Sequence, residues 1–252
     1  VWFPAVPDTT PYHVRNNVTS LIKKIYNMKE YYKGEPKILV SVDCIVLGFE
    51  DKKLRLLVGK RKVEPGSGKL SLYGGFVREN ESLKQAANRV LCQCTGIKDI
   101  YMLQVGAFGE TDRDPGDRVI SIAYCALINA PDYDRQLLEK NDLQWVDIDK
   151  IPELYGDHIA MVQMALSQLR KLLNKTPVSL SLLPELFTLT QLQHVHEAIL
   201  GAEVDKRNFR KRIKQTDFIE KTSLIDKVTS KRGAALYRFN RQAFKDTSVY
   251  RL

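Results

Sequence analysis

One stretch of the sequence combines residue types that could hold a metal ion and a phosphate group. Residues 74–97 read GGFVRENESLKQAANRVLCQCTGI, which has the glycines and the length of a loop–helix–loop phosphate site. A divalent cation in such a frame needs oxygen ligands on one helix face, three and four residues apart. The corresponding part of this helix, residues 89–94, reads RVLCQC and contains no carboxylate. The frame is therefore present without the ligands of its usual chemistry.

A second set of polar residues interrupts an apolar run upstream. In KILVSVDCIVLGF, residues 37–49, alternation puts Ser41 and Asp43 on a face that should also be buried. A buried carboxylate needs partners, so Asp43 is either a structural hydrogen-bond acceptor or an acceptor for ligand hydroxyls, and both alternatives stay open. Further side chains that could line the same cavity are Lys60, Arg61, Tyr73 and Phe76, with Arg113, Asp114 and Arg118 as lining or as a solvated turn.

The C-terminal part of the chain holds most of its positive charge. Residues 178–252 carry 14 Lys and Arg against 8 Asp and Glu, whereas the other 177 residues carry 25 against 22. A basic excess in a short segment favours a polyanion-binding module, with nucleic acid as the leading candidate. Charge alone fits a merely basic surface equally well.

The basic segment has the pattern of two helices followed by a hairpin. Thr190 is expected to begin a helix that ends at Gly201, and Asp205 to cap a second helix that reaches Lys214. Two extended segments around residues 230–233 follow, which is typical of a winged helix–turn–helix. The residues expected to contact DNA are Thr190, Lys206, Arg207, Asn208, Arg210, Lys211, Lys214, Lys231 and Arg232.

The elements that must position these residues are read from periodicity. A helix is expected over residues 82–93, ending at Gly96, and others over 13–32 and 157–174. Helices and strands do not alternate along the chain, which favours a mixed sheet over a doubly wound one. The expected strands are residues 37–49, 53–61, 69–77, 101–109, 118–128 and 143–151.

The remaining bulk properties exclude several classes of protein. The four cysteines form no C-x-x-C pair, so neither a disulfide framework nor a zinc site is expected. Every apolar run is shorter than the ~20 residues that span a membrane, and the start lacks the pattern of a signal peptide. We therefore expect a cytoplasmic protein with reduced cysteines, without a membrane partner and without a metal or cofactor.

The stretch quoted first resembles the Nudix box, G-x5-E-x7-R-E-U-x-E-E-x-G-U, where U is a bulky aliphatic residue. The resemblance extends over residues 36–149, with SLYGGFV similar to the strand that leads into the box. The positions that match in register are Gly75, Glu81, Arg89, Leu91, Gly96 and Ile97.

The departures from the box concern its magnesium ligands. The positions of three metal-binding glutamates in that family correspond here to Val90, Gln93 and Cys94, which are poor partners for magnesium. The resemblance with these departures implies a binding domain without catalytic residues. The alternative is a divergent hydrolase that uses Glu79, Glu81 and a remote carboxylate such as Glu110.

A degenerate Nudix-like domain joined to a winged helix–turn–helix resembles the Nudix-related transcriptional regulators. The expected fold is α+β: a Nudix-like α/β/α sandwich with a mixed sheet, then the winged domain. Expected parts are an N-terminal arm and helix (1–35), an effector domain (36–155), a linker helix and junction (156–183) and the DNA-binding domain (184–252).

The resemblance implies a homodimer, most simply a repressor, that grips a double-stranded operator and responds to a small effector. The segments RDPGDRVISIAYCALI and LLPELFTLTQLQ look closer to the pentose-responsive branch, which implies a sugar such as arabinose; the alternative is an ADP-ribose-responsive regulator. The linker helix is the expected lever between the domains. The residues expected to bind the effector are Asp43, Lys60, Tyr73, Gly75, Phe76, Glu81 and Arg89.

Overall fold

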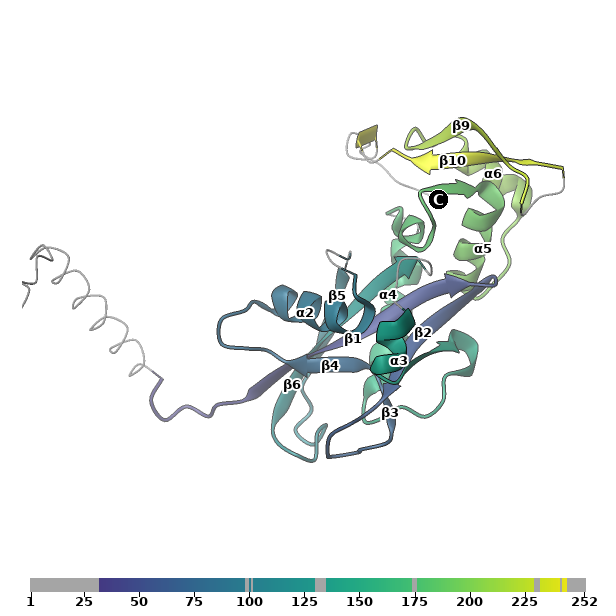
Figure 1. Cartoon of the computed structure of the whole chain (residues 1–252). Coiled ribbons are helices and arrows are strands. Elements are labelled where there is room, and N and C mark those ends of the chain that lie inside the picture. Colours follow the sequence, from purple (N-terminus) through teal and green to yellow (C-terminus); the bar gives the residue numbers. More distant parts are fainter. Residues whose placement is uncertain are drawn as a thin grey trace, which may run out of the picture. The chain divides into compact units, whose positions relative to one another are not determined.

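Figure 1 shows the computed structural model, which describes residues 32–97, 100, 102–129, 135–173, 176–228, 232–240 and 242–243. The chain forms two compact units, residues 1–38 and 39–252. In the unit of residues 1–38, a hydrogen bond from the Glu35 N–H to the Tyr32 carbonyl at 3.2 Å closes a turn. The helix expected over residues 13–32 falls almost wholly outside the described residues, as does Lys231.

Strand β1 is the centre of a mixed sheet in the second unit. It runs parallel to β6 over its whole length, while its other edge is shared between β2 near residue 47 and β4 near residue 42. Strands β3 and β7 extend the sheet beyond β2, and β5 extends it beyond β6. The strands are β1 (Leu39–Glu50), β2 (Lys53–Lys60), β3 (Leu70–Ser71), β4 (Tyr73–Phe76), β5 (Met102–Phe108), β6 (Val119–Asn129) and β7 (Leu143–Asp147).

The two faces of this sheet are covered by different helices. Because side chains alternate along a strand, Val42, Cys44 and Val46 of β1 pack with α2 (Leu83–Thr95), whereas Ile45 and Leu47 pack with α4 (His158–Leu172). The sheet with a helix on either face is the expected α/β/α sandwich (Figure 1). Shorter helices are α3 (Arg135–Lys140), η2 (Ile148–Lys150) and η3 (Val178–Leu182).

The local sequence accounts for the bounds of α2. Ser82 caps its N-terminus in a capping box with Gln85, and Gly96 ends it with φ of 76°. A residue with a side chain is strained at that dihedral angle, so glycine is the natural stop. The helix begins one residue later and ends two residues later than the expected span of 82–93.

Two expected features of the chain differ in the structure. The single strand expected over residues 69–77 is two strands, because the Leu72 N–H donates to His158 Nδ1 at 3.1 Å instead of continuing a ladder. The helix expected to begin at Thr190 begins at Leu189, with Thr188 as its cap in a second capping box with Gln191. Helix α3 and the short strand β8 (Leu186–Thr188) were not expected.

The C-terminal part is a winged helix–turn–helix. Helix α5 (Leu189–Leu200) is followed by α6 (Lys206–Ile213) and by a hairpin of β9 (Ile219–Asp226) and β10 (Ala234–Phe239). The order of its small sheet is β8-β10-β9. Asp205 caps α6 by accepting from the Asn208 N–H at 2.7 Å, as the sequence predicts.

A continuous apolar core joins the winged helix to the large sheet. Phe187, Leu192, Val195, Phe209 and Phe218 belong to the same buried cluster as the α4 face of the sheet. The two parts of the second unit are therefore packed against each other. In the described part of the chain, every helix is too short or too polar to cross a membrane.

Candidate functional site

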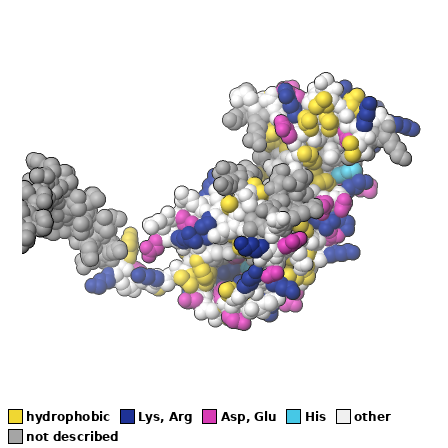
Figure 2. Space-filling view, in the orientation of Figure 1, with side chains coloured by type: hydrophobic (Ala, Val, Ile, Leu, Met, Phe, Trp, Pro, Cys, Tyr) yellow, Lys and Arg dark blue, Asp and Glu magenta, His cyan; other side chains and the backbone are white. Residues whose placement is uncertain are grey.

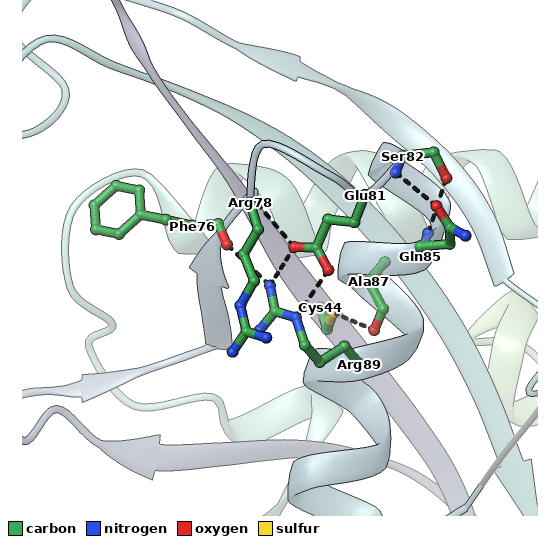
Figure 3. Close-up of polar contacts among 8 residues, drawn as sticks. All are labelled: Cys44, Phe76, Arg78, Glu81, Ser82, Gln85, Ala87 and Arg89. Carbon is green, nitrogen blue, oxygen red and sulfur yellow. Dashed lines mark hydrogen bonds and ion pairs between the residues drawn. The ribbon is translucent and has the colours of Figure 1, made fainter. Parts of the chain in front are cut away.

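The loop of the box is held closed by an ion pair between Glu81 and Arg89 (Figure 3). Arg89 donates to the Glu81 carboxylate from Nη2 at 2.6 Å and from Nε at 3.0 Å, and also to the Phe76 carbonyl at 2.9 Å. The Arg78 N–H donates to the same carboxylate at 2.9 Å. These hydrogen bonds lower the pKa of Glu81 to about 2. Both side chains are therefore engaged in shaping the loop.

The positions that would hold magnesium are mostly part of the core. Val90 is 1% exposed and Cys94 is fully buried, while Gln93 faces solvent. Burial raises the pKa of the Cys94 thiol to about 12, so the group is neutral and a weak metal ligand. Among the described residues, no group of three His, Cys, Asp or Glu side chains is arranged to hold a metal ion.

The two glycines before the box are explained by their neighbours. A side chain at Gly75 would meet Val90 Cγ2 at 3.2 Å. At Gly74 it would lie 2.2 Å from Asp43 Oδ1 and 2.8 Å from the Val42 carbonyl oxygen. Gly74 is therefore needed because the Asp43 carboxylate lies directly over it.

A cluster of charged side chains is buried on the α4 face around Asp43. The Asp43 carboxylate accepts from Ser121 Oγ at 2.5 Å and lies 3.9 Å from Arg113 Nη2 and 3.8 Å from His158 Nε2. Arg113 also donates to the Asp157 carboxylate from Nε at 2.9 Å and from Nη2 at 2.8 Å. We call these five residues the Asp43 cluster.

Burial shapes the protonation of the Asp43 cluster. The Arg113 and His158 side chains are 6% and 5% exposed. Burial lowers the pKa of His158, although the nearby Asp43 opposes the shift. Burial also acts against the charge of Arg113, but the hydrogen bonds and charge of Asp157 outweigh it and raise its pKa. The cluster thus holds an arginine cation against carboxylates beside a neutral histidine.

An arginine and a tyrosine lie beside this cluster. The Arg61 guanidinium stacks 4.2 Å from the centre of the Tyr155 ring, a favourable cation–π contact. The edge of Tyr155 lies against His158, with 6.1 Å between ring centres. The Tyr155 hydroxyl is buried and has no hydrogen-bond partner among the described residues. Cationic, aromatic and hydroxyl groups therefore meet at this end of the α4 face.

The residues expected to bind the effector are divided between the two faces of the sheet. Asp43 and Phe76 lie on the α4 face, because Phe76 pairs with Ser41, and Phe76 is 56% exposed. Tyr73 and Gly75 lie on the α2 face. Glu81 and Arg89 bind each other, and Lys60 is exposed at the end of β2.

Sequence reasoning missed three members of the Asp43 cluster: Ser121, Asp157 and His158. Ser121 interrupts the apolar run of β6 in the way that Asp43 interrupts β1, and this was a usable signal. That Ser121 reaches Asp43 follows from the parallel register of β1 and β6, in which Ser41 pairs with Ser121. This register could not be read from the chain.

Helix α6 presents a basic surface in the winged helix. Phe209 and Ile213 are buried, whereas Lys206, Arg207, Asn208, Lys211 and Lys214 are exposed. Arg212, absent from the expected set, is exposed as well. Helical periodicity puts Arg207, Asn208 and Lys211 on the side opposite the buried pair. This face has the charge and shape that suit a DNA groove.

Two residues of the expected DNA set are engaged within the protein. Arg210 is half-buried and donates from Nη2 to Thr190 Oγ1 at 3.0 Å, joining α6 to α5. In the hairpin, Arg232 lies just before β10, while Lys231 is outside the described residues. On the side seen in Figure 2, Lys and Arg are interleaved with Asp and Glu over the body of the molecule. The positive charge is therefore not gathered on that side.

The fold, the Asp43 cluster and the basic face of α6 together define a class of protein: a Nudix domain joined to a winged DNA-binding domain. Family models match the chain as a NUDIX domain over residues 37–165 and as an NrtR DNA-binding winged helix domain over residues 179–239. The ADPR responsive transcriptional repressor NtrR of Acinetobacter baylyi is 33% identical over 222 residues, covering 86% of this chain and 88% of that protein.

Two further similarities cover different shares of the chain. The Shewanella oneidensis NrtR structure, complexed with a 27mer DNA, has a TM-score of 0.75 at 29% identity and covers 84% of this chain and 97% of that chain. An ADP-ribose pyrophosphatase of Methanocaldococcus jannaschii is 28% identical over 124 residues, which is 49% of this chain and 70% of that enzyme. The chain belongs to the NrtR-type family of Nudix-related transcriptional regulators. The pentose branch predicted from sequence finds no support among these relatives.

Proposed function

We propose that this protein is a DNA-binding transcriptional repressor whose Nudix-like domain binds ADP-ribose or a closely related nucleoside diphosphate sugar. The observation that carries the proposal is a Nudix frame with core residues at two of its metal positions, packed on a winged helix with an exposed basic helix. The name of the Acinetobacter baylyi relative, an ADPR responsive repressor, supports ADP-ribose over the pentose predicted from sequence.

The Asp43 cluster and its neighbours suit the chemistry of this effector. ADP-ribose offers ribose hydroxyls, a diphosphate and an aromatic base. The Asp43 carboxylate accepts from hydroxyls, and the guanidinium of Arg61 attracts phosphate. The exposed ring of Phe76 provides a surface for stacking a base. A simple pentose would use only the first of these three features, which is a reason of chemistry to prefer the larger ligand.

The proposed protein is a receptor and not a hydrolase. Diphosphate hydrolysis in this fold needs a divalent cation to offset phosphate charge and activate water. Val90 and Cys94 are buried among apolar side chains and the Cys94 thiol is neutral, which supports a binding role. Glu81 is engaged by Arg89, so it is poorly disposed to replace the missing ligands.

The proposal extends to assembly on DNA. Two copies related by a two-fold axis would present two α6 helices to half-sites about one helical turn apart, or a multiple of that. We also propose that the chain divides into an N-terminal arm and helix (1–35), an effector domain (36–155), a linker helix and junction (156–183) and a DNA-binding domain (184–252).

The test begins by selecting a preferred sequence from a random double-stranded DNA library with the full chain. Fluorescence anisotropy then gives the affinity for that DNA at fixed salt, with and without ADP-ribose or arabinose. We expect ADP-ribose to weaken binding and arabinose to leave it unchanged. The reverse result would restore the pentose assignment, and the absence of any preferred sequence would exclude a repressor.

Two further measurements bear on the same proposal. Replacing Arg207 by Ala should weaken DNA binding about tenfold and reduce the slope of log affinity against log salt by roughly one. The matched control is Lys171→Ala, which removes an exposed cation from α4 and should change neither value. Incubation with magnesium and ADP-ribose, followed by chromatography, should release no AMP; steady turnover would identify a divergent hydrolase instead.

A further inference from the structure

Helix α4 is held at its N-terminal end by the Asp43 cluster. Asp157 occupies the N-cap position but makes no side-chain capping bond to the helix; both of its carboxylate oxygens accept from Arg113 instead. The next residue, His158, accepts the Leu72 N–H and lies beside Asp43. The start of α4 is thus fixed by three polar contacts to the β5–β6 loop and the sheet.

The same helix is fixed at its other end to the winged helix. Arg170 Nε donates to the Ile199 carbonyl at 3.0 Å, at the C-terminus of α5. A side chain at Gly201, which ends α5, would lie 3.7 Å from Arg170 Nη2. The last carbonyls of a helix lack partners within it and carry partial negative charge, so a cation there is favourable. Arg170 therefore supplies a bond that α5 needs.

Helix α5 is in turn connected to the recognition helix. Arg210 of α6 donates to Thr190 near the start of α5. The His196 and Phe209 rings meet edge to face, with 5.0 Å between centres. Both contacts join α6 to α5, so a displacement of α5 also moves the basic surface of α6.

Between its two ends α4 makes mostly apolar contacts, with one hydrogen bond from Gln168 Nε2 to the Val105 carbonyl of β5 at 2.6 Å. Met161, Val162, Ala165 and Leu169 are buried against the sheet in apolar packing, which has little directional preference. The polar contacts at the two ends fix where each end lies. The helix spans about 22 Å at the usual rise per residue, enough to connect the two sites.

We infer that α4 transmits effector binding to α6, with Arg113–Asp157 as its input contact and Arg170–Ile199 as its output contact. This inference rests on the proposed function. A ligand that draws Arg113 towards its own anionic group weakens the hold on Asp157 and shifts α4, and Arg170 passes the shift to α5. Coupling of this kind is reciprocal, so DNA changes effector affinity by the same factor.

The experiment compares Arg170→Met with Lys171→Met, which removes the same charge from the next residue of α4. Titration calorimetry measures ADP-ribose binding, and anisotropy measures affinity for the selected DNA with and without ADP-ribose. In the wild type and in Lys171→Met, ADP-ribose should weaken DNA binding on the order of tenfold. In Arg170→Met each ligand alone should bind normally, while the weakening should fall towards none.

The outcomes separate this inference from the proposed function. Absence of ADP-ribose binding by the wild type would overturn both. Binding with wild-type coupling retained in Arg170→Met would overturn only the role of α4. Arg170→Lys, which can still donate to the Ile199 carbonyl, should keep most of the coupling.

If Arg170→Met no longer binds DNA, hydrogen exchange still tests the inference. Hydrogen exchange without DNA should show that ADP-ribose changes amide protection in α4 and α5 of the wild type. In the variant the change should stop at α4. A change that still reaches α5 in the variant would overturn the inference.

Discussion

The two faces of the large sheet bury side chains of opposite character. On the α2 face, Val90, Cys94 and their neighbours form an apolar core. On the α4 face, Asp43, Arg113 and His158 are buried together beside an equally apolar core. A buried charge is costly unless paired, so the α4 face holds an energetically demanding group of residues where a plain core would suffice. The comparison teaches that polar chemistry in this domain lies opposite the helix that carries its sequence signature.

The largest effect should come from placing a carboxylate on the α2 face. Cys94→Glu buries a charge without a partner and should lower the free energy of unfolding by about 3–5 kcal/mol. Gln93→Glu, on the exposed side of the same helix, should change it by less than about 0.5 kcal/mol. Urea denaturation followed by circular dichroism measures both. Similar, small effects of the two substitutions would mean that the α2 face can accept metal ligands, and the contrast between the faces would not hold.

The α4 face can be tested by removing its buried cation. Arg113→Met leaves the Asp43 and Asp157 carboxylates without their arginine and should cost about 2–3 kcal/mol in the free energy of unfolding. The control is Arg118→Met in the same loop, where the arginine is half-buried and donates to the Glu110 carbonyl at the surface. If Arg113→Met left the free energy of unfolding unchanged, the arginine would not be needed to balance the charge of the two carboxylates.

Sensitivity to acid should come from two buried histidines, His158 in the Asp43 cluster and His196 in the winged helix. His196 belongs to the α5–α6 contact, and burial lowers its pKa to about 4; the pKa of His158 is lowered too. The unfolded chain takes up these protons near pH 6.5 while the folded chain resists, so stability is complete above pH 6.5 and falls below it.

For His196 alone this amounts to about 2 kcal/mol between pH 7.5 and pH 5. His196→Leu should remove that part of the pH dependence of urea denaturation. His194→Asn, at a half-buried position on the same helix, should retain it. An unchanged pH dependence in His196→Leu would contradict the assignment.

The smallest effect is expected at the ion pair that closes the box. The lowered pKa of Glu81 means that its pair with Arg89 contributes above about pH 4.5 and is lost as pH falls towards 2. Glu81→Gln should lower the melting temperature slightly at pH 7 and speed hydrogen exchange in residues 77–82. Glu79→Gln is the control. Equal exchange in both variants would mean that the loop does not depend on this pair.

The sequence was informative where a local pattern decides the structure. The frame of the box, its stop at Gly96 and the Asp205 cap are set by neighbours three or four residues away. The start of α5 was misplaced although the Thr188–Gln191 capping pattern was readable.

The partners of Asp43 could not be predicted from the chain. Ser121 lies 78 residues away and reaches it through the register of parallel strands. Arg113 and Asp157 are 44 residues apart and meet only when the β5–β6 loop folds onto the start of α4. Such contacts depend on tertiary packing, for which a single sequence has no local signal. The division of Tyr73 and Phe76 between faces, in contrast, follows from strand alternation.

The pairing of Arg113 with Asp157 has a consequence for how sharply any anion can be sensed. The two oxygens of Asp157 already occupy the guanidinium at 2.8 and 2.9 Å, so an incoming phosphate must displace a tethered rival at high local concentration. Weak or singly charged metabolites would lose that contest, and only a well-matched ligand at sufficient abundance would win it. In the proposed receptor this competition would set a threshold for the ligand, which a change at the Asp157 carboxylate would alter.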